Sequence, residues 1–150
     1  MDSPNATPLA VFDTNICLDF FVFKDPVSSH VLEAVNTHKL TAITREDCRE
    51  EFLRVLAYQK LGLSENEQDQ AITLFDQSIT VLTVPSKDKT RLPLCTDSDD
   101  QKFLEIAYDA NATFLFTKDK ALLKLNRYNR KRGLFRIVTP AIWLSENPES

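Results

Sequence analysis

Glycine is scarce in this 150-residue chain, which contains only Gly62 and Gly133. GxGxxG dinucleotide turns and Walker A loops each need at least two closely spaced glycines, so both are excluded. No apolar run approaches the roughly 18 residues of a membrane-spanning helix, because Asp19 and Lys24 interrupt the longest candidate. The formal net charge of −4 excludes a uniformly basic nucleic-acid-binding coat but allows a local basic patch.

Cysteine is rare as well. Cys17, Cys48 and Cys95 are odd in number and widely spaced, and they form no CxxC pair. This pattern argues against a disulfide framework or a thiolate zinc site and favours a reducing, cytoplasmic location. The first residues contain neither the basic nor the apolar region of a secretory signal, so we expect no signal peptide.

The length predicts one domain. We expect residues 1–7 to be a disordered leader, residues 8–144 to form the domain and residues 145–150 to be a loose tail. Short apolar runs alternate with helical patterns, and the expected strands cover 9–12, 40–43, 79–84, 113–116 and 135–138. This alternation predicts an α/β protein, with three α/β/α layers and a mostly parallel sheet of about five strands.

The expected helices lie between and after these strands. They cover 14–23, 27–38, 44–61, 64–77, 98–110 and 118–127, and a last helix starts at Pro140. Capping patterns mark several of their starts: Thr44 with Asp47, Ser64 with Glu67, Ser98 with Gln101, and Thr139 before Pro140.

Aspartate follows the first and the fourth expected strand, as Asp13 and Asp119. In open α/β sheets, ligands bind in the crevice outside the carboxyl ends of the strands. Each aspartate alone could simply cap a helix, but two strand tips that both present a carboxylate indicate the start of a site.

Two helical acids are predicted to face the interior. Glu51 and Asp100 each share the apolar stripe of their helix, so they point with the core-facing residues. Their neighbours Glu50 and Asp99 fall on the solvent side, Asp99 on the same side as Lys102. Acidic side chains that face the interior from two helices packed on a sheet are unusual, and this pair therefore indicates a functional role.

Asp13, Glu51, Asp100 and Asp119 would repel one another in a common crevice. Two unit charges 4 Å apart cost about 1 kcal/mol in water and about 4 kcal/mol at an effective dielectric of 20. Asp97 could join them, although acids near a helix start are also favoured by the helix dipole alone. All-oxygen ligands suit Mg²⁺ or Mn²⁺, and such ions assist phosphodiester hydrolysis.

With these residues in view, the chain resembles PIN-domain ribonucleases, most of all bacterial PIN proteins regarded as toxins of toxin–antitoxin pairs. The resemblance spans residues 9–144 and is carried by four segments: 11–15 (VFDTN), 49–56 (REEFLRVL), 95–104 (CTDSDDQKFL) and 116–123 (FTKDKALL). It implies a three-layer α/β/α fold and Mg²⁺- or Mn²⁺-dependent endoribonuclease activity.

The resemblance also implies roles for seven residues. Asp13, Glu51, Asp100 and Asp119 would be catalytic and bind metal, Asp97 would be a further metal ligand, and Asn15 and Thr117 would orient carboxylates or a water.

A basic stretch surrounds and follows Asp119. It contains Lys118, Lys120, Lys124, Arg127, Arg130, Lys131 and Arg132, with Tyr128 among them. Such a stretch is a candidate surface for RNA phosphates with one stacking ring, and its alternative is a solvated helix and turn. The residues expected to bind substrate are Lys118, Lys120, Arg130, Lys131 and Arg132.

Several functions remain open at this stage. The leading hypothesis is a toxin that cleaves single-stranded RNA, with a small antitoxin protein or a second copy of the chain as partner and no membrane association. An aspartyl phosphatase needs a second acid two residues after its nucleophile, where Asn15 stands. A receiver-like magnesium-binding module or an RNA-binding scaffold would lack nuclease activity. Phe20, Phe21 or Phe23 could be exposed for a partner.

Overall fold

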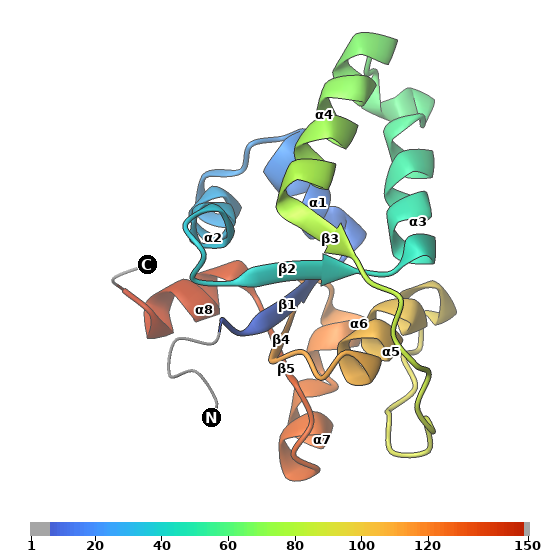
Figure 1. Ribbon diagram of the computed structural model, residues 1–150, viewed down its shortest axis with the longest axis vertical. Helices are drawn as coiled ribbons and strands as arrows, with labels where there is room; N and C mark the ends of the chain where they lie inside the picture. Colours follow the sequence, from blue (N-terminus) through green and yellow to red (C-terminus); the bar gives the residue numbers. More distant parts are fainter. Residues whose placement is uncertain (1–6, 149–150) are drawn as a thin grey trace.

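Five parallel strands form the centre of the protein in a computed structural model, which describes residues 7–148 (Figure 1). The strands are β1 (Leu9–Phe12), β2 (Thr41–Thr44), β3 (Ile79–Val81), β4 (Phe114–Phe116) and β5 (Arg136–Val138). Their order is β3-β2-β1-β4-β5, and all four neighbouring pairs are parallel. The predicted parallel sheet is confirmed, with β1 in the middle.

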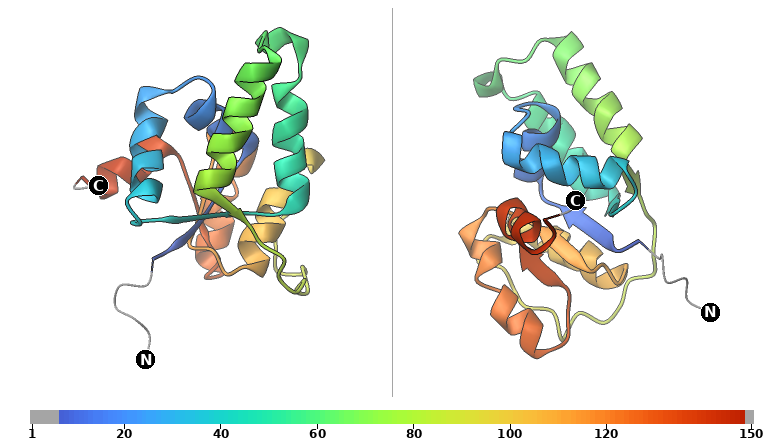
Figure 2. Two further views of the ribbon diagram at one scale, coloured as in Figure 1. Left: turned by 45° about the horizontal axis from the view of Figure 1, so that its top comes forward. Right: turned by 90° about the vertical axis from the view of Figure 1, so that its left-hand side faces the viewer.

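Helices cover both faces of the sheet and complete the three predicted layers (Figure 2). One face carries α1 (Thr14–Phe21), α2 (Pro26–Asn36), α3 (Glu46–Leu56), α4 (Glu65–Ser78) and α8 (Pro140–Glu146). The other carries α5 (Gln101–Asp109), α6 (Lys120–Leu123) and α7 (Asn126–Lys131). Two 3-10 turns, η1 (Gln59–Leu61) and η2 (Ser98–Asp100), precede α4 and α5. No helix within residues 7–148 is long and apolar enough to cross a membrane.

Burial on both faces explains why β1 is a continuous apolar run. Ala10 and Phe12 enter the core beneath α1–α4, whereas Val11 enters the core beneath α5. Phe12 is paired in register with Phe116, and their stacked rings have centroids 5.0 Å apart. Because this pairing fixes how the two strands end, it also fixes the side chains that follow them.

The predicted cap at Thr44 is wrong. Thr44 is the last residue of β2 and pairs with Val81, and its carbonyl accepts a hydrogen bond from the Leu82 N–H at 2.9 Å. Thr44 therefore belongs to the sheet, and α3 starts two residues later. Arg45 precedes it without a side-chain cap, and its guanidinium instead binds Asp47 at 2.8 Å.

Other boundaries also moved. The helix expected over 44–61 ends at Leu56, and η1 then leads to Gly62, whose φ of 65° suits glycine. The helix expected over 118–127 is divided into α6 and α7. The strands expected over 40–43 and 79–84 are β2 and the shorter β3.

Two of the predicted caps are confirmed. Ser64 and Glu67 form a reciprocal capping box at the start of α4, and the Thr139 hydroxyl accepts from the Ile142 N–H at 3.0 Å. The pattern at Ser98 is wrong, because Asp97 accepts from the Asp99 N–H at 3.0 Å and caps η2 instead.

The chain ends differ from the expected boundaries where the structure describes them. α8 continues to Glu146, whose carboxylate binds Arg136 at 2.8 Å, so residues 145 and 146 are helical rather than part of a loose tail. Thr7 donates a hydrogen bond to the His38 carbonyl at 3.3 Å. The rest of the expected leader, residues 1–6, and the final residues 149–150 lie outside the described range.

Candidate active site

The carboxyl ends of β1 and β4 lie side by side at the centre of the sheet. After β1 the chain continues to β2 and β3 on one side of β1, and it later returns to form β4 and β5 on the other side. The carboxyl end of β1 is therefore the topological switch point of the sheet. The Asp13 N–H continues the β1–β4 pairing by donating to the Phe116 carbonyl at 3.2 Å. Asp13 and Thr117 are therefore neighbours by backbone geometry.

Asp13 is buried, with 4% of its surface exposed. Its Oδ1 accepts from the Ile16 N–H at 3.0 Å, which caps α1, and its Oδ2 accepts from the Thr117 hydroxyl. Burial, together with the negative charges of Asp119 and Glu51, raises the pKa of Asp13 to about 6, against the opposing effect of these hydrogen bonds.

Thr117 joins the two strand-tip aspartates. Its side chain is fully buried, and its hydroxyl oxygen accepts from the Asp119 N–H at 2.9 Å while its proton goes to Asp13. The Asp119 carboxylate caps α6 by accepting from the Ala121 N–H at 3.0 Å. One buried hydroxyl thus fixes the Asp13 carboxylate and the Asp119 backbone relative to the sheet.

Asp100 reaches the same place from η2, and its carboxyl group is hydrogen-bonded to that of Asp119. Burial, this hydrogen bond and the negative charges of Asp97 and Asp119 raise the pKa of Asp100 to about 7. Asp100 is half-buried, whereas Asp97 and Asp99 are exposed, which agrees with the helical spacing for Asp99 and Asp100. Asp97 acts on the cluster through its charge.

Glu51 approaches from α3 and is half-buried, whereas Glu50 is exposed. One Glu51 oxygen accepts from the Thr14 hydroxyl, and the other is in ion-pair contact with the ammonium of Lys102 on α5. Sequence reasoning missed Lys102, because it lies on the same side as the exposed Asp99. No signal in the local pattern reveals that α3 passes close enough for its side chain to reach Glu51.

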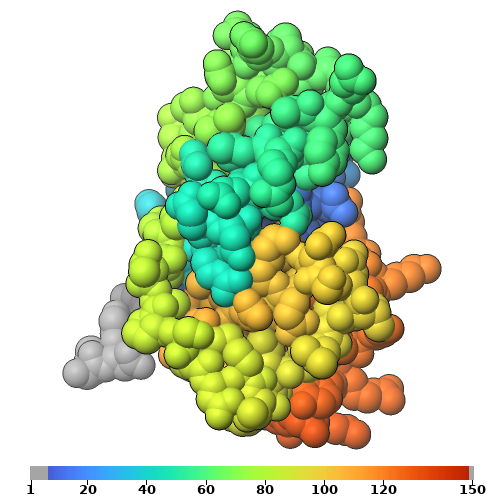
Figure 3. Space-filling view, turned by 90° about the vertical axis from the view of Figure 1, so that its right-hand side faces the viewer, coloured from blue at the N-terminus to red at the C-terminus, as the bar shows by residue number. Residues whose placement is uncertain are grey.

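Figure 3 faces the side toward which β2 points in Figure 1. Blue atoms of the N-terminal segment are visible there between the green surface of α3 and the gold and orange surface of α5 and β4–α6. The acids listed above come from these segments. Asp13 is buried, and Glu51, Asp100 and Asp119 are half-buried, so the cluster does not project from the surface.

The donor set of the cluster fits a hard divalent cation, because every side chain there that could act as a ligand is a carboxylate or a hydroxyl. Within residues 7–148, however, no three acidic, thiol or imidazole side chains are already arranged as a ligand shell. Glu51 is held by Lys102, and Asp100 and Asp119 are held by each other. Mg²⁺ or Mn²⁺ would replace these two contacts.

Two predicted residues lie differently from what their proposed roles require. Asn15 is exposed in the first turn of α1, so it borders the site without being fixed inside it. Lys118 is ion-paired with the buried Asp19 of α1, which also accepts from the Ser28 hydroxyl at 3.3 Å. This pairing directs Lys118 toward α1 and does not support its predicted contact with substrate.

The remaining basic residues form a surface on α6 and α7. Arg127, Arg130 and Lys131 line a concavity of about 420 Å³ on α7, and Lys120 is exposed at the start of α6. The Arg132 guanidinium lies 3.7 Å from the centre of the Tyr128 ring. The predicted stacking ring is thus already covered on one face by a cation.

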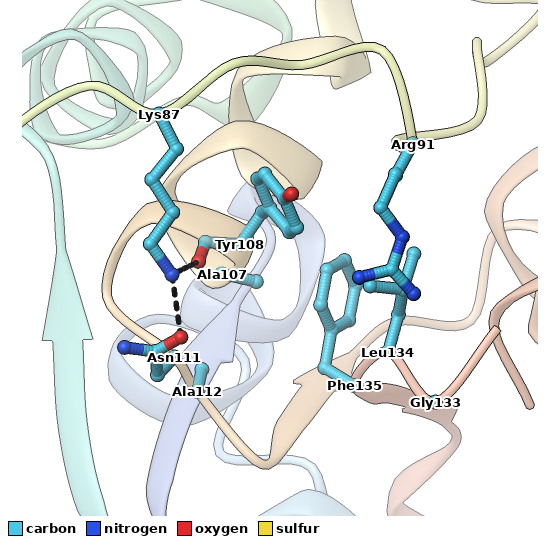
Figure 4. Close-up of a pocket in the computed structure, with 9 residues that line it drawn as sticks. All are labelled: Lys87, Arg91, Ala107, Tyr108, Asn111, Ala112, Gly133, Leu134 and Phe135. Carbon is cyan, nitrogen blue, oxygen red and sulfur yellow. Dashed lines mark hydrogen bonds between the residues drawn. The ribbon is translucent and has the colours of Figure 1, made fainter.

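A second cavity, of about 330 Å³, lies at the opposite, amino edge of the sheet (Figure 4). Lys87 and Arg91 of the loop after β3 flank it, and Lys87 points toward Asn111 whereas Arg91 points toward Leu134. The Lys87 ammonium donates to the Tyr108 carbonyl at 3.0 Å and to the Asn111 side chain, and Arg91 donates to the Arg132 carbonyl. These cations attach the loop to the carboxyl ends of α5 and α7, away from the acid cluster.

The strand order separates this protein from one alternative. Receiver-like domains have a doubly wound sheet with the order 2-1-3-4-5, whereas this sheet has the order 3-2-1-4-5. The receiver-like hypothesis is therefore wrong.

Comparison with known proteins adds two findings. The sequence profile of the PIN domain matches residues 10–121, which covers β1 through the start of α6 and includes all the clustered acids. The chain is also 26% identical over 144 residues to an uncharacterized protein, MJ1680, of the archaeon Methanocaldococcus jannaschii, with 91% of this chain and 89% of that protein covered.

Proposed function

Because the chain belongs to the PIN-domain family, whose members are generally nucleases that use divalent metals, we propose that it is a Mg²⁺- or Mn²⁺-dependent endoribonuclease acting on single-stranded RNA. The observation that carries this proposal is the meeting of Asp13, Asp100 and Asp119 at the β1–β4 switch point, with Glu51 beside them.

In this proposal Asp13, Asp100 and Asp119 hold the cation, and Glu51 joins them once it leaves Lys102. A divalent ion bound there would lower the pKa of a coordinated water and offset negative charge on the phosphodiester. In such a hydrolysis a water oxygen would bond to phosphorus as the bond from phosphorus to O3′ breaks, and the proton lost by water would end on O3′. The products are a 3′-hydroxyl and a 5′-phosphate.

The chain's own residues prepare this reaction. Thr117 and the Ile16 N–H each donate one hydrogen bond to Asp13, which fixes both of its oxygens. Because Asp13 is buried, a phosphate must reach below the surrounding surface to approach it. A flexible single strand can present a phosphate in this way more readily than a duplex can, which supports single-strand selectivity.

Attraction of RNA must come from a local feature, because the net charge is −4. Arg127, Arg130 and Lys131 on α7 provide a concave basic surface, and Lys120 lies on α6, the helix capped by Asp119. We assign substrate binding to Lys120 and this surface, with Arg132 at its border. A chain that leaves the acid cluster along α6 would meet these residues next.

The proposal is tested by cleavage of one end-labelled RNA in single-stranded and duplex form, with Mn²⁺, with Mg²⁺ or with EDTA. We expect cleavage of the single strand with either ion, little cleavage of the duplex and none with EDTA. Asp119→Asn should be inactive, whereas Asp88→Asn, at an exposed acid in the loop after β3, should retain parental activity. Equal cleavage by parent and Asp119→Asn would overturn the proposal.

An aspartyl phosphatase is the second candidate, and the strand-tip position of Asp13 is what favours it. It would hydrolyse a small phosphate ester such as p-nitrophenyl phosphate and leave RNA intact. Asn15 occupies the place of the second acid that such enzymes need, which is why we rank it below the nuclease.

We extend the proposal to a toxin role in the cytoplasm. Three free, buried cysteines support a reducing compartment. Phe20 and Phe21 are buried, but Phe23 is 55% exposed and Val27 is 45% exposed on the neighbouring turn, so they offer an apolar contact for a small antitoxin or a second copy. A small reading frame next to this gene whose product relieves growth arrest would support the role, and harmless overexpression would contradict it.

A further inference from the structure

We infer that Lys102 is the internal counter-ion of the acid cluster, and that it competes with the divalent cation for Glu51. This inference rests on the proposed metal-dependent function. In the metal-free protein the Lys102 ammonium neutralises Glu51, and cation binding requires it to withdraw. Lys102 would therefore be a positioning residue that sets metal affinity.

The contact joins two different helices. Lys102 lies in the first turn of α5 and reaches Glu51 on α3, and the Thr14 hydroxyl holds the other Glu51 oxygen. The Lys102 side chain is 15% exposed, donates to the Asp99 carbonyl and lies 5.2 Å from the centre of the Phe103 ring. Because these contacts and the low exposure hold the Lys102 side chain in one position, it differs from a surface lysine that moves freely in water.

The surrounding charges give this contact its significance. Neighbouring cations are engaged outside the cluster, Arg45 with Asp47 and Glu105, and Lys118 with Asp19. Lys102 thus supplies positive charge directly to a carboxylate of the cluster. An ammonium has one charge and fixed covalent attachment, whereas Mg²⁺ or Mn²⁺ has two charges and can contact several carboxylates at once.

Two consequences follow from this competition. Without Lys102, Glu51 is free to bind the cation, so the dissociation constant for Mn²⁺ should fall, by about tenfold if the ion pair costs the cation about 1.4 kcal/mol. The metal-free protein should at the same time become less stable, because Glu51 would add unbalanced charge to Asp13 and Asp119. Tighter Mn²⁺ binding together with lower stability of the metal-free protein is the result expected if Lys102 competes with the cation for Glu51.

The test measures Mn²⁺ binding to the full chain by calorimetry, and thermal unfolding in EDTA, for the parent, Lys102→Met, Lys102→Arg and Lys60→Met. Lys60 is an exposed lysine on η1 and controls for loss of one positive charge. We expect Lys102→Met to bind Mn²⁺ about tenfold more tightly and to unfold at lower temperature in EDTA, with Lys102→Arg and Lys60→Met close to the parent. The Lys102→Met effect on affinity should shrink in a Glu51→Gln background.

Unchanged or weaker Mn²⁺ binding by Lys102→Met, with normal binding by the parent, would overturn this inference alone. Absence of Mn²⁺ binding in the parent as well as in Lys102→Met would overturn the metal-dependent function, and this inference with it. If Lys102→Met failed to fold, Lys102→Gln with a shorter polar chain would take its place in the same measurements.

Discussion

The acid cluster has two halves that are built differently. The strand half consists of Asp13, Thr117 and Asp119, whose positions follow from the pairing of β1 with β4. The helix half consists of Glu51, Asp100 and Lys102, which arrive on separate helices and are held mainly by side-chain contacts to other charged groups. Backbone register is costly to change, whereas a contact between two side chains is exchanged readily.

This difference assigns different tasks to the two halves. We expect the strand half to supply fixed oxygens, because the buried Thr117 hydroxyl is hydrogen-bonded to the Asp13 carboxylate and to the Asp119 backbone N–H. We expect the helix half to balance charge, because Lys102 is ion-paired with Glu51 and because the raised pKa of Asp100 favours its neutral form. Damage to the strand half should therefore impair both cation binding and chemistry, whereas damage to the helix half should change cation affinity with a smaller loss of chemistry.

The largest effect is expected from Asp13→Asn in the strand half. The substitution keeps the shape and removes the charge, and we expect kcat at saturating Mn²⁺ to fall about 1000-fold, or about 4 kcal/mol in activation free energy. Glu51→Gln in the helix half should lower kcat only about tenfold and weaken cation binding instead. Single-turnover cleavage of labelled RNA measures both, and equal losses would break the division into halves.

Next in size is the pH dependence of the metal-free fold. Burial raises the pKa of Asp13 to about 6 and that of Asp100 to about 7, above the 3.8 of the unfolded chain. The folded state therefore binds more protons between these values, and the free energy of unfolding should fall as pH rises from 4 to 7. The part due to Asp13 is about 3 kcal/mol at most.

Urea unfolding in EDTA at several pH values checks this expectation. Asp13→Asn should reduce the slope, and Mn²⁺ should reverse the loss of stability near pH 7, because the cation replaces the protons. Stability that rises over this range in EDTA would contradict the assignment of both raised pKa values.

Thr117→Val sharpens the comparison within the strand half. The substitution keeps the volume but leaves the Asp119 N–H and Asp13 Oδ2 without their buried partner. We expect a loss of about 2 kcal/mol in the free energy of unfolding and a 10- to 100-fold loss of metal affinity or activity. Thr113→Val, at an exposed residue just before β4, is the control and should change neither quantity.

The smallest effect concerns the basic surface, which lies outside both halves. Replacing Arg127, Arg130 and Lys131 by Gln should weaken RNA binding and make the fall of log K with log salt shallower by about 2, since each lost phosphate contact on a single strand contributes about 0.7. Replacement of Lys24, Arg54 and Lys60 by Gln changes the net charge equally and should leave the slope unchanged. An unchanged slope for the α7 variant would remove this surface from the proposal.

The sequence predicted the strand half well, because it depends on local features. An apolar run that stops at an acid is visible without tertiary information, and β1 and β4 end at the expected residues, Phe12 and Phe116, although β4 begins one residue later than expected. For the helix half, helical spacing correctly separated Glu51 and Asp100 from their exposed neighbours Glu50 and Asp99.

What failed depends on long-range contacts. The cap at Thr44 was lost to pairing of β2 with β3, and the contact of Lys102 with Glu51 depends on how closely α3 passes α5. The basic stretch was predicted to form one helix, but the structure divides it into α6 and α7. Lys118 forms an ion pair with Asp19, which the sequence did not predict. The positions of charged residues in the sequence do not show which of them form ion pairs in the folded protein.

The hydrogen bond from Thr117 to Asp13 has a direction, since a hydroxyl has one proton to give and the Asp119 N–H already points at its oxygen. Each Asp13 oxygen consequently accepts one hydrogen bond from the protein and keeps one lone pair that could bind a cation. The Thr117 hydroxyl proton is shielded from water, so it should exchange slowly enough to give its own NMR resonance. That resonance would report on the electron density of Asp13 and would move when a diamagnetic ion such as Mg²⁺ draws on the same carboxylate.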